Sequence, residues 1–178
     1  MDVVKRNVEA LNGAVSVSSR QGRGSTVTIK LPLTLAILDG LLLKVGSQTY
    51  VLPLISILES IRPKAEQLST VAGSGEVVAV RGEPLPLLRL HRLFGVPDAV
   101  TDPTVGLLVV VENHGKRLAF LVDELLGQQQ VVVKSLEANF RKVEGAAGAT
   151  ILGDGRAALI LDVAGLAQLA HASAWVGV

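Results

Sequence analysis

Two stretches of this chain recur about seventy residues further on, and this repetition limits the folds that it can adopt. The segment LLLKVGSQTYVLPLISILE (41–59) matches LLVVVENHGKRLAFLVDELLG (107–127), and VVAVRGEPLPLLRLHRLF (77–94) resembles ATILGDGRAALILDVAGL (149–166). Each copy has an apolar run, a turn that contains glycine and a second apolar run. A solenoid needs three or more shorter repeats, so two long repeats indicate a duplicated β unit.

Residues 34–170 are therefore predicted to form two small curled sheets or β-barrels related by approximate two-fold symmetry. Closing each sheet removes the edges that would otherwise pair with other chains. The loop at 95–103 separates the two repeats less neatly than a linker would, so we expect the chain to cross between the units and exchange strands. Short helices are expected at 56–61, 88–94 and 163–172, and loops at 70–76 and 95–103.

The opening residues, 1–33, have a different pattern, which is typical of a helix followed by a β-hairpin. Apolar residues between Val4 and Leu11 recur at helical spacing. Two alternating runs, at 14–19 and 26–33, predict strands joined by a glycine-rich turn. Because this unit is too small to be stable alone and the chain opens inside a helix, we expect it to have been cut from a longer protein.

The composition favours a folded, strand-rich protein and excludes several classes of site. Hydrophobic residues make up 49% of the sequence, which argues against disorder, and 18 glycines break the valine-rich runs into strands and turns. The formal net charge of +1 gives no general attraction to nucleic acid or to anionic membranes. The sequence contains no cysteine, so disulfides and thiolate metal sites are excluded.

Two further features of the sequence bear on its compartment. The apolar run at 31–45 is interrupted by Asp39-Gly40 and is too short to span a bilayer. The N-terminal residues lack the basic, apolar and cleavage regions of a signal peptide. A soluble intracellular protein is therefore expected.

The residues that could carry chemistry do not form a consistent catalytic pattern. The stretch QGRGST (21–26) is a candidate phosphate cradle, but it lacks the P-loop lysine and the strand-to-helix context, so a hairpin turn is favoured. The adjacent carboxylates at 123–124 would point to opposite faces of a strand. The histidines are too far apart in sequence for an i, i+4 metal pair, and ordinary surface positions are expected for His91, His114 and His171.

Several long motifs occur in an order that is typical of one family. The first 40 residues, MDVVKRNVEALNGAVSVSSRQGRGSTVTIKLPLTLAILDG, resemble the end of the ATPase domain of CheA chemotaxis histidine kinases, running into their regulatory domain. YVLPLISILESIRP (50–63) and VVAVRGEPLPLLRL (77–90) resemble the first half of that regulatory domain. GQQQVVVKSLEANFRKVEGAAGATILGDGRAALILDV (127–163) resembles its second half.

The resemblance implies a mainly β architecture with two parts. Residues 34–178 would be a CheW-like regulatory domain of two five-stranded, SH3-like β-barrels with pseudo-two-fold symmetry. Residues 1–33 would be the C-terminal remnant, a helix and a β-hairpin, of a GHKL-type ATPase domain. The nucleotide-binding motifs of that domain are missing, so this fragment is expected to be no enzyme and to hold no cofactor, catalytic residue or metal. The parent would be a protein histidine kinase that uses ATP and Mg²⁺.

The resemblance also implies a regulatory scaffold role in a two-component system. Domains of this family bind the adaptor CheW and the cytoplasmic tips of chemoreceptors, and they couple receptor state to autophosphorylation by the rest of the kinase. No nucleic-acid partner and no direct membrane insertion are expected, and the protein would be cytoplasmic, associated with membranes through receptor arrays. The junction between the two domains is expected at Leu33, Thr34 and Leu35, directly after Pro32.

Candidate partner-binding residues lie in polar rims beside apolar strands. Ser47 and Gln48 form one rim with Tyr50, and Gln128 and Gln129 form the other. The chain has one tyrosine, and tyrosine is enriched at interface hot spots. A packing role in the core or at its rim stays open for each of these residues.

Two other functions stay open at this point. The turn QGRGST (21–26) suggests a nucleotide-binding kinase fragment. The CheW-like part suggests a free-standing CheW-type adaptor, although the ATPase-like residues 1–33 argue against it because adaptors lack them.

Overall fold

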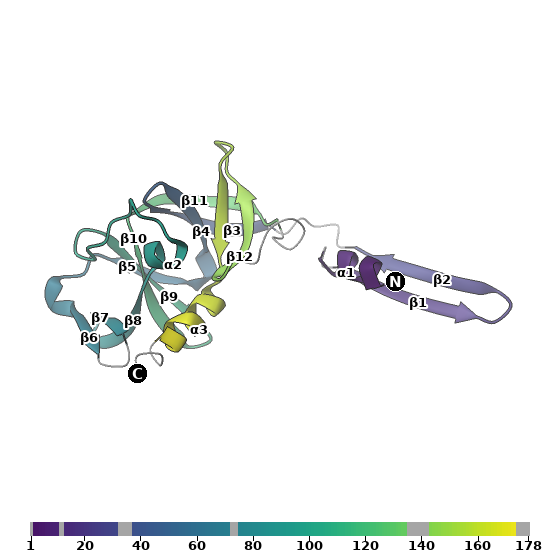
Figure 1. Ribbon diagram of the computed structural model, residues 1–178, viewed down its shortest axis with the longest axis horizontal. Coiled ribbons are helices and arrows are strands. Elements are labelled where there is room, and N and C mark those ends of the chain that lie inside the picture. Colours follow the sequence, from purple (N-terminus) through teal and green to yellow (C-terminus); the bar gives the residue numbers. More distant parts are fainter. Residues whose placement is uncertain (1, 11–12, 32–36, 72–74, 135–142, 174–178) are drawn as a thin grey trace.

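The structure is a computed structural model that describes residues 2–10, 13–31, 37–71, 75–134 and 143–173. The chain folds mainly into β-strands, as the valine-rich sequence indicates (Figure 1). A helix and a long hairpin at the N-terminus stand apart from a larger body that contains two curved sheets. None of the helices within those ranges is long and apolar enough to cross a bilayer.

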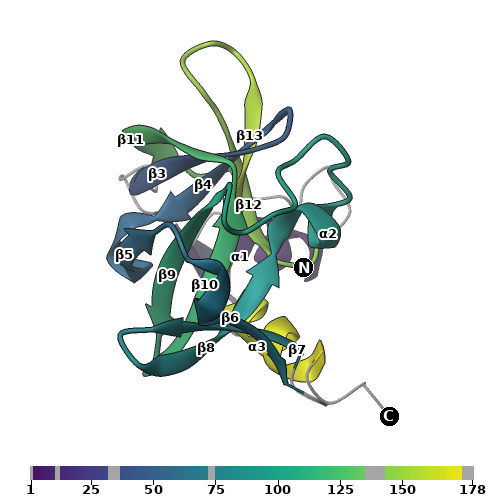
Figure 2. The ribbon, with the colours of Figure 1, turned by 90° about the vertical axis from the view of Figure 1, so that its left-hand side faces the viewer.

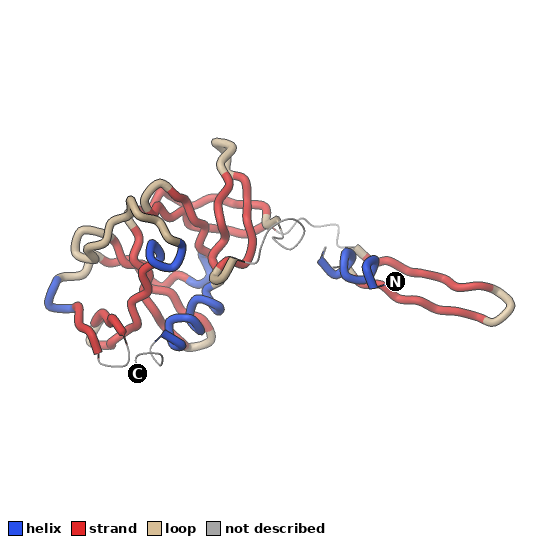
Figure 3. The backbone as a smooth tube through the Cα atoms, viewed as in Figure 1, coloured by secondary structure: helices blue, strands red, loops and turns tan. Residues whose placement is uncertain are grey.

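The N-terminal unit contains one helix and two antiparallel strands: α1 (Asp2–Ala10), β1 (Ala14–Arg20) and β2 (Gly24–Lys30). The predicted helix and hairpin are therefore confirmed, and Figure 3 shows the two strands as a long extended ribbon. Val17 lies opposite Val27 in the hairpin, and both side chains are exposed. Val8 of α1 is 8% exposed and lies so close to Gly13 that a Cβ atom there would clash with it.

The body contains two sheets. The first is built from β3 (Ile37–Val45), β4 (Gln48–Pro53), β11 (Glu124–Val132), β12 (Ala146–Ile151) and β13 (Ala157–Leu161). Its strand order is β11-β3-β4-β13-β12. The second is built from β5 (Ile57–Ile61), β6 (Leu68–Val71), β7 (Gly75–Val80), β8 (Glu83–Arg89), β9 (Leu107–Asn113) and β10 (Lys116–Val122). Its strand order is β5-β9-β10-β8-β7-β6.

The two repeats exchange strands between the sheets, as predicted. The first repeat supplies β3 and β4 to the five-stranded sheet and then crosses into the six-stranded sheet as β5. The second repeat supplies β9 and β10 to the six-stranded sheet and then crosses back as β11. Figure 2 shows the five-stranded sheet above the six-stranded one, with these crossovers between them. The two halves are thus interlocked through shared sheets and are not separate, consecutive units.

The strand registers repeat as well. In β5, Leu58 bulges between Ile57 and Glu59, where the strand pairs with β9. In β11, Leu126 bulges between Leu125 and Gly127, where the strand pairs with β3. Each crossover strand is therefore bulged at the same place in its repeat. Parallel pairing also recurs, with β13 beside β4 and β8 beside β10.

The five-stranded sheet curls so that its two ends meet. An antiparallel bridge joins Lys134, just after β11, to Ala149 of β12, with N···O distances of 2.8 and 3.1 Å. The other sheet has six strands where five were expected. It also curls, as a contact between distant strands shows. The guanidinium of Arg81, between β7 and β8, lies 3.1 Å from the carboxylate of Glu59 on the edge strand β5.

Helices α2 (Leu90–Phe94) and α3 (Val163–Ser173) follow the corresponding strands β8 and β13, as predicted. The predicted helix at 56–61 is wrong, because Ile57–Ile61 is strand β5 and only Leu54–Ser56 makes a 3-10 turn. A short apolar run fits both the helical and the strand periodicity, and the pairing of Ile57–Ile61 with β9 shows that this one is a strand. The expected loop at 70–76 is shorter than predicted, since β6 and β7 extend into it; residues 72–74 lie outside the described residues.

The main hydrophobic core belongs to both sheets. Phe120 of β10 lies at its centre with no exposed surface, together with Leu43 of β3 and Leu118 of β10. Leu90 of α2 and Leu166 of α3 complete the same cluster, so the helices seal the space between the sheets. Because one core serves both repeats, they are expected to fold and unfold together.

The turn between β9 and β10 contains an unfavourable backbone conformation. His114 has φ 49° and Gly115 has φ 77°, the left-handed region that favours Asn-Gly in a two-residue hairpin. Replacing His114 with asparagine is therefore expected to raise the free energy of unfolding by about 0.5 kcal/mol, whereas alanine should lower it. Chemical denaturation of both variants measures the difference, and equal effects would contradict this explanation.

Candidate protein-interaction site

The β3–β4 hairpin carries three of the predicted partner-binding residues, Ser47 in its turn and Gln48 and Tyr50 on β4. Ser47 and Gln48 are exposed, but Tyr50 is 3% exposed and stacks on Phe94 of α2 with ring centroids 4.8 Å apart and planes 24° apart. Burial raises the pKa of the Tyr50 hydroxyl. The structure therefore favours the packing alternative for Tyr50 and leaves Ser47 and Gln48 accessible.

These three residues line one cavity of about 310 Å³ between the β3–β4 turn and the loop after α2. Val96 and Pro97 of that loop form its other side. The cavity is near the lower limit for a small-molecule site, but it is wide enough for a side chain of a partner protein.

Gln128 and Gln129 lie elsewhere, on the exposed edge strand β11. They pair with Leu41 and Gly40 of β3, whereas Ser47 follows the far end of that strand. Six residues of strand separate Leu41 from Ser47, which corresponds to about 20 Å. The structure does not bring the two predicted rims together into one site. The junction residues Leu33, Thr34 and Leu35 lie outside the described residues.

Asp123 fixes the geometry of the crossover from β10 to β11. Its carboxylate accepts hydrogen bonds from the backbone N–H groups of Gly46 at 2.8 Å and Val100 at 2.9 Å. Its own N–H donates to the carbonyl oxygen of Lys44 at 2.8 Å. Asp123 therefore holds the β3–β4 turn and the loop before β9 through its carboxylate, and the start of β11 through its backbone N–H. The expectation that Asp123 and Glu124 form no acid–base pair is consistent with this positioning role.

The corresponding crossover in the first repeat, from β4 to β5, exposes apolar side chains instead. Ile55 is 95% exposed and Leu58 is 50% exposed. Ile55 occupies the repeat position that Asp123 occupies in the other half. Adjoining exposed apolar side chains mark candidate protein contacts, so Ile55 and Leu58 are considered together. We call residues 54–58 the crossover segment. The sequence signal for it was an apolar run, LPLISIL (52–58), that only Ser56 interrupts, at a place where the chain turns.

His91 corrects the expectation of three surface histidines, because it is 9% exposed. Within the part of the chain that the structure describes, its Nδ1 has no hydrogen-bond partner. Burial first, and then the charges of Arg89 and Arg92, lower its pKa, while the carboxylates of Asp123 and Glu76 act in the opposite direction.

A pH-dependent stability follows from this buried histidine. Its pKa is lower in the folded state, so the unfolded chain takes up the proton more readily and stability falls as the pH drops below 6.5. We expect His91→Asn to flatten the dependence of the free energy of unfolding on pH between about 7 and 5. Identical slopes in wild type and His91→Asn would contradict the assignment.

A partly buried ion pair supports the loop beside His91. The Arg89 guanidinium donates to both carboxylate oxygens of Glu76, one at 2.8 Å, and to the carbonyl oxygen of Thr101. The hydrogen bond from Arg89 holds the pKa of Glu76 below its usual value. This arrangement joins β7, β8 and the loop before β9, and the paired charges line a small cavity of about 140 Å³.

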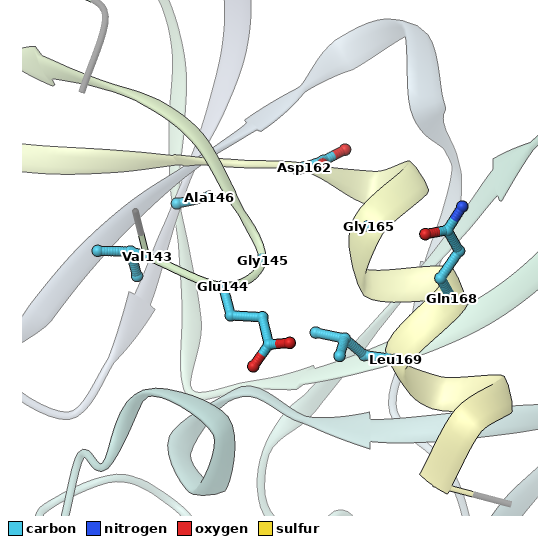
Figure 4. Close-up of a pocket in the computed structure, with 8 residues that line it drawn as sticks. All are labelled: Val143, Glu144, Gly145, Ala146, Asp162, Gly165, Gln168 and Leu169. Atoms are coloured by element: carbon cyan, nitrogen blue, oxygen red, sulfur yellow. The ribbon is translucent and has the colours of Figure 1, made fainter. Parts of the chain in front are cut away.

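A further cavity of about 610 Å³ lies between α3 and the segment that leads into β12. Its carboxylates come from Glu144 and Asp162, and Figure 4 shows them pointing in different directions, Glu144 toward Leu169 and Asp162 away from the segment. Two divergent carboxylates are not arranged for acid–base catalysis. Among the described residues there is no group of three or more His, Asp or Glu side chains that could hold a metal ion.

The family to which this arrangement belongs follows from comparison with known proteins. A sequence model of the CheW-like domain matches residues 39–171, which include both body sheets and most of α3. The chain belongs to the CheW-like domain family. The match begins two residues into β3, so α1, β1 and β2 lie outside the matched residues.

Relatives of this CheW-like domain are chemotaxis proteins. Chemotaxis protein CheA of Klebsiella aerogenes is 52% identical over 169 residues, covering 95% of this chain and 26% of the relative. CheA of Rhizobium meliloti is 46% identical over 164 residues, covering 92% and 22%. Sensor histidine kinase CheAY of Helicobacter pylori is 41% identical over 171 residues, covering 96% and 21%. The chain thus spans 26% or less of the length of these relatives.

The fold of the CheW-like domain also occurs in a solved structure. The scaffolding protein TtCheW from Thermoanaerobacter tengcongensis superposes with a TM-score of 0.55 over 71% of this chain and 89% of that chain, at 14% sequence identity. At this identity the likeness concerns the fold alone.

Proposed function

We propose that the chain is a regulatory scaffold module of a chemotaxis histidine kinase. The observation that carries the proposal is the CheW-like match over 39–171 in a chain whose relatives are CheA proteins. In this role it binds the adaptor CheW and the cytoplasmic tips of chemoreceptors, and it couples receptor state to autophosphorylation by the rest of the kinase. A typical coupling of this kind is about 1–3 kcal/mol.

The architecture supports binding by two related halves. We propose that each sheet forms an SH3-like barrel, with the pseudo-two-fold axis relating the crossovers at β5 and β11. Paired bulges at Leu58 and Leu126 and the bridge from Lys134 to Ala149 support this arrangement. A duplicated fold offers two similar but non-identical surfaces, which suits a module that connects different neighbours.

The crossover segment is the first candidate contact surface. Ile55 and Leu58 supply exposed apolar area, which is what an interface core needs. The exposed polar residues Ser47, Gln48, Gln128 and Gln129 are proposed as rim contacts, and rim contacts contribute less to affinity than buried anchors.

Residues 1–33 are proposed to be the C-terminal end of an ATPase domain, with 34–178 as the CheW-like regulatory domain. The similarity to CheA over 169 residues extends beyond the residues that the CheW-like model matches, which supports the assignment. The exposed apolar residues Val17 and Val27, away from the base of the β1–β2 hairpin, are consistent with a surface that the remainder of such a domain covers. Leu33, Thr34 and Leu35 stay the predicted junction.

The module itself is proposed to carry out no catalysis and to hold no cofactor, while ATP and Mg²⁺ belong to the parent kinase. Its place would be the cytoplasm, associated with membranes through receptor arrays and without inserting into them. Nucleic acid is not a proposed partner, because the net charge of +1 provides no basic surface for it.

Co-sedimentation with receptor-containing membranes tests the receptor-coupling role. The folded chain should pellet with membranes that carry chemoreceptors, and the adaptor CheW should increase the bound fraction. Membranes without receptors are the control. A folded chain that stays in the supernatant in every case would contradict the proposal.

The alternative of a nucleotide-binding fragment is tested separately by calorimetry with ATP and Mg²⁺. The stretch 21–26 spans the turn between β1 and β2, so its N–H groups do not open a helix as those of a P-loop do. We therefore expect no saturable heat. The alternative of a free-standing adaptor predicts that the chain substitutes for CheW in the membrane experiment, and we expect that it does not.

A further inference from the structure

Three apolar side chains point outward from one end of the five-stranded sheet. Ile37 is 61% exposed, Val132 is 38% exposed and Ile151 is 52% exposed. We call these three residues the junction patch, because Ile37 is the first described residue after the N-terminal unit. The patch extends from β3 onto β11, whereas the crossover segment follows β4 on the other side of β3, so we treat the two as separate surfaces.

Strand pairing places the three side chains together. Val132 of β11 lies directly opposite Ile37 of β3. The bridge between Lys134 and Ala149 runs antiparallel, which brings Ile151, two residues along β12, to the level of Val132, two residues back along β11. Side chains alternate along strands, and the neighbours Val131 and Leu152 are buried in the inner core, so the junction patch faces solvent.

The N-terminal unit exposes a second apolar surface. Val17, Val27, Ile29 and Leu31 are between 46% and 53% exposed. An isolated two-stranded hairpin is marginally stable at best in water, so this unit needs a surface to cover it. The β2 end of the unit is joined directly to the junction patch by residues 32–36.

We infer that the junction patch is the docking surface for the N-terminal unit, residues 2–31, through Ile29 and Leu31 at the base of its hairpin. Six residue steps from Leu31 to Ile37 span at most about 20 Å, so the two surfaces are held within reach. A short tether gives an effective concentration in the millimolar range, so a small apolar contact is enough. Exposed Lys30 and Asp39, one beside each surface, have opposite charges and favour the same arrangement.

This contact deepens the proposed function and rests on it for its regulatory meaning. If the N-terminal unit is the C-terminal end of an ATPase domain, docking at the junction patch would give that domain one preferred orientation on the CheW-like domain. A receptor that favours or disfavours the docked arrangement then changes the activity of the kinase through its differential affinity alone, whereas the adaptor binds both arrangements equally. The docking itself is a property of this chain and is measured without any partner.

Disulfide trapping tests the docking directly, because the chain has no cysteine of its own. The variant Ile29→Cys/Val132→Cys should form an intramolecular disulfide at least tenfold faster than Ile29→Cys/Leu126→Cys under the same oxidant. Leu126 is a matched control, since it is 48% exposed on the same strand but about 20 Å further along it. Equal rates would overturn the inference, and intermolecular disulfides as the main product would indicate that a second copy covers the patch.

A second variant separates docking from partner binding. Val132→Lys, at an exposed position, should slow trapping of Leu31→Cys with Ile151→Cys at least tenfold while leaving the affinity for the adaptor CheW unchanged. Unchanged trapping would overturn the docking inference. Loss of adaptor binding in this variant would instead place the junction patch in the partner interface and would equally overturn it. Failure of the wild-type chain to bind the adaptor would count against the proposed function alone.

Discussion

Truncation of Phe120 to alanine is expected to lower the free energy of unfolding by about 3–5 kcal/mol and to destabilise both sheets together. Phe120 has no exposed surface, and its cluster takes residues from both sheets and both body helices. Removing the ring leaves a cavity that rigid strands on either side cannot fill. A loss of this size is a large part of the stability of an ordinary domain.

Chemical denaturation followed by two probes measures this effect. Near-UV circular dichroism reports on the packed Tyr50 ring of the five-stranded sheet, and far-UV circular dichroism reports on all strands. The two transitions should coincide in wild type and shift together in Phe120→Ala. Leu126→Ala, at a half-exposed bulge, is the control and should change stability little. Separate transitions for the two probes would contradict a shared core.

The largest effect on binding is expected at Ile55. Replacing Ile55 with aspartate should weaken the affinity for a protein partner at the crossover segment by about 2–4 kcal/mol, or roughly thirtyfold or more. The substitution places a charge where an apolar anchor would be buried, and burying an unpaired charge is costly. Because Ile55 is 95% exposed, the free energy of unfolding should stay nearly unchanged.

Matched variants distinguish a contact at Ile55 from a general effect of charge. Val105→Asp changes another exposed β-branched side chain, 63% exposed in the loop before β9, and should leave partner affinity unaltered. Ile55→Leu should retain most of the affinity. Affinity measurements on the three variants with the adaptor CheW, and with a receptor cytoplasmic fragment, decide the matter. Equal affinities for Ile55→Asp and wild type with both partners would remove the crossover segment from the interface.

The repeat explains why so much of the fold was predictable. Two copies of an apolar hairpin followed by a short helix give duplicated β units, and an untidy boundary between the copies indicated strand exchange. The structure has both features, with β5 and β11 crossing over. Where the sequence was misread, at 56–61, an apolar run of five to six residues fits a helix and a strand equally, and only the distant pairing with β9 decides.

The candidate site was less predictable because exposure depends on tertiary contacts. Tyr50 was a reasonable interface residue by type, but Phe94 covers its ring. Ile55 was not among the predicted contact residues, but the chain turns there and leaves it 95% exposed. His91 was expected at the surface because charged residues flank it, and packing of α2 buries it instead. The two crossovers occupy equivalent positions in the repeat. One carries Asp123, whose carboxylate accepts backbone hydrogen bonds, and the other carries the exposed Ile55.

Isothermal titration of the folded chain with the purified adaptor CheW tests the proposal most directly. A duplicated CheW-like domain that connects signalling proteins should bind the adaptor saturably, with a dissociation constant in the micromolar range or below, and the affinity should fall in Ile55→Asp. A folded chain that gives no binding heat at several temperatures, and no complex in sedimentation, would contradict the proposal that this domain is a protein-binding scaffold.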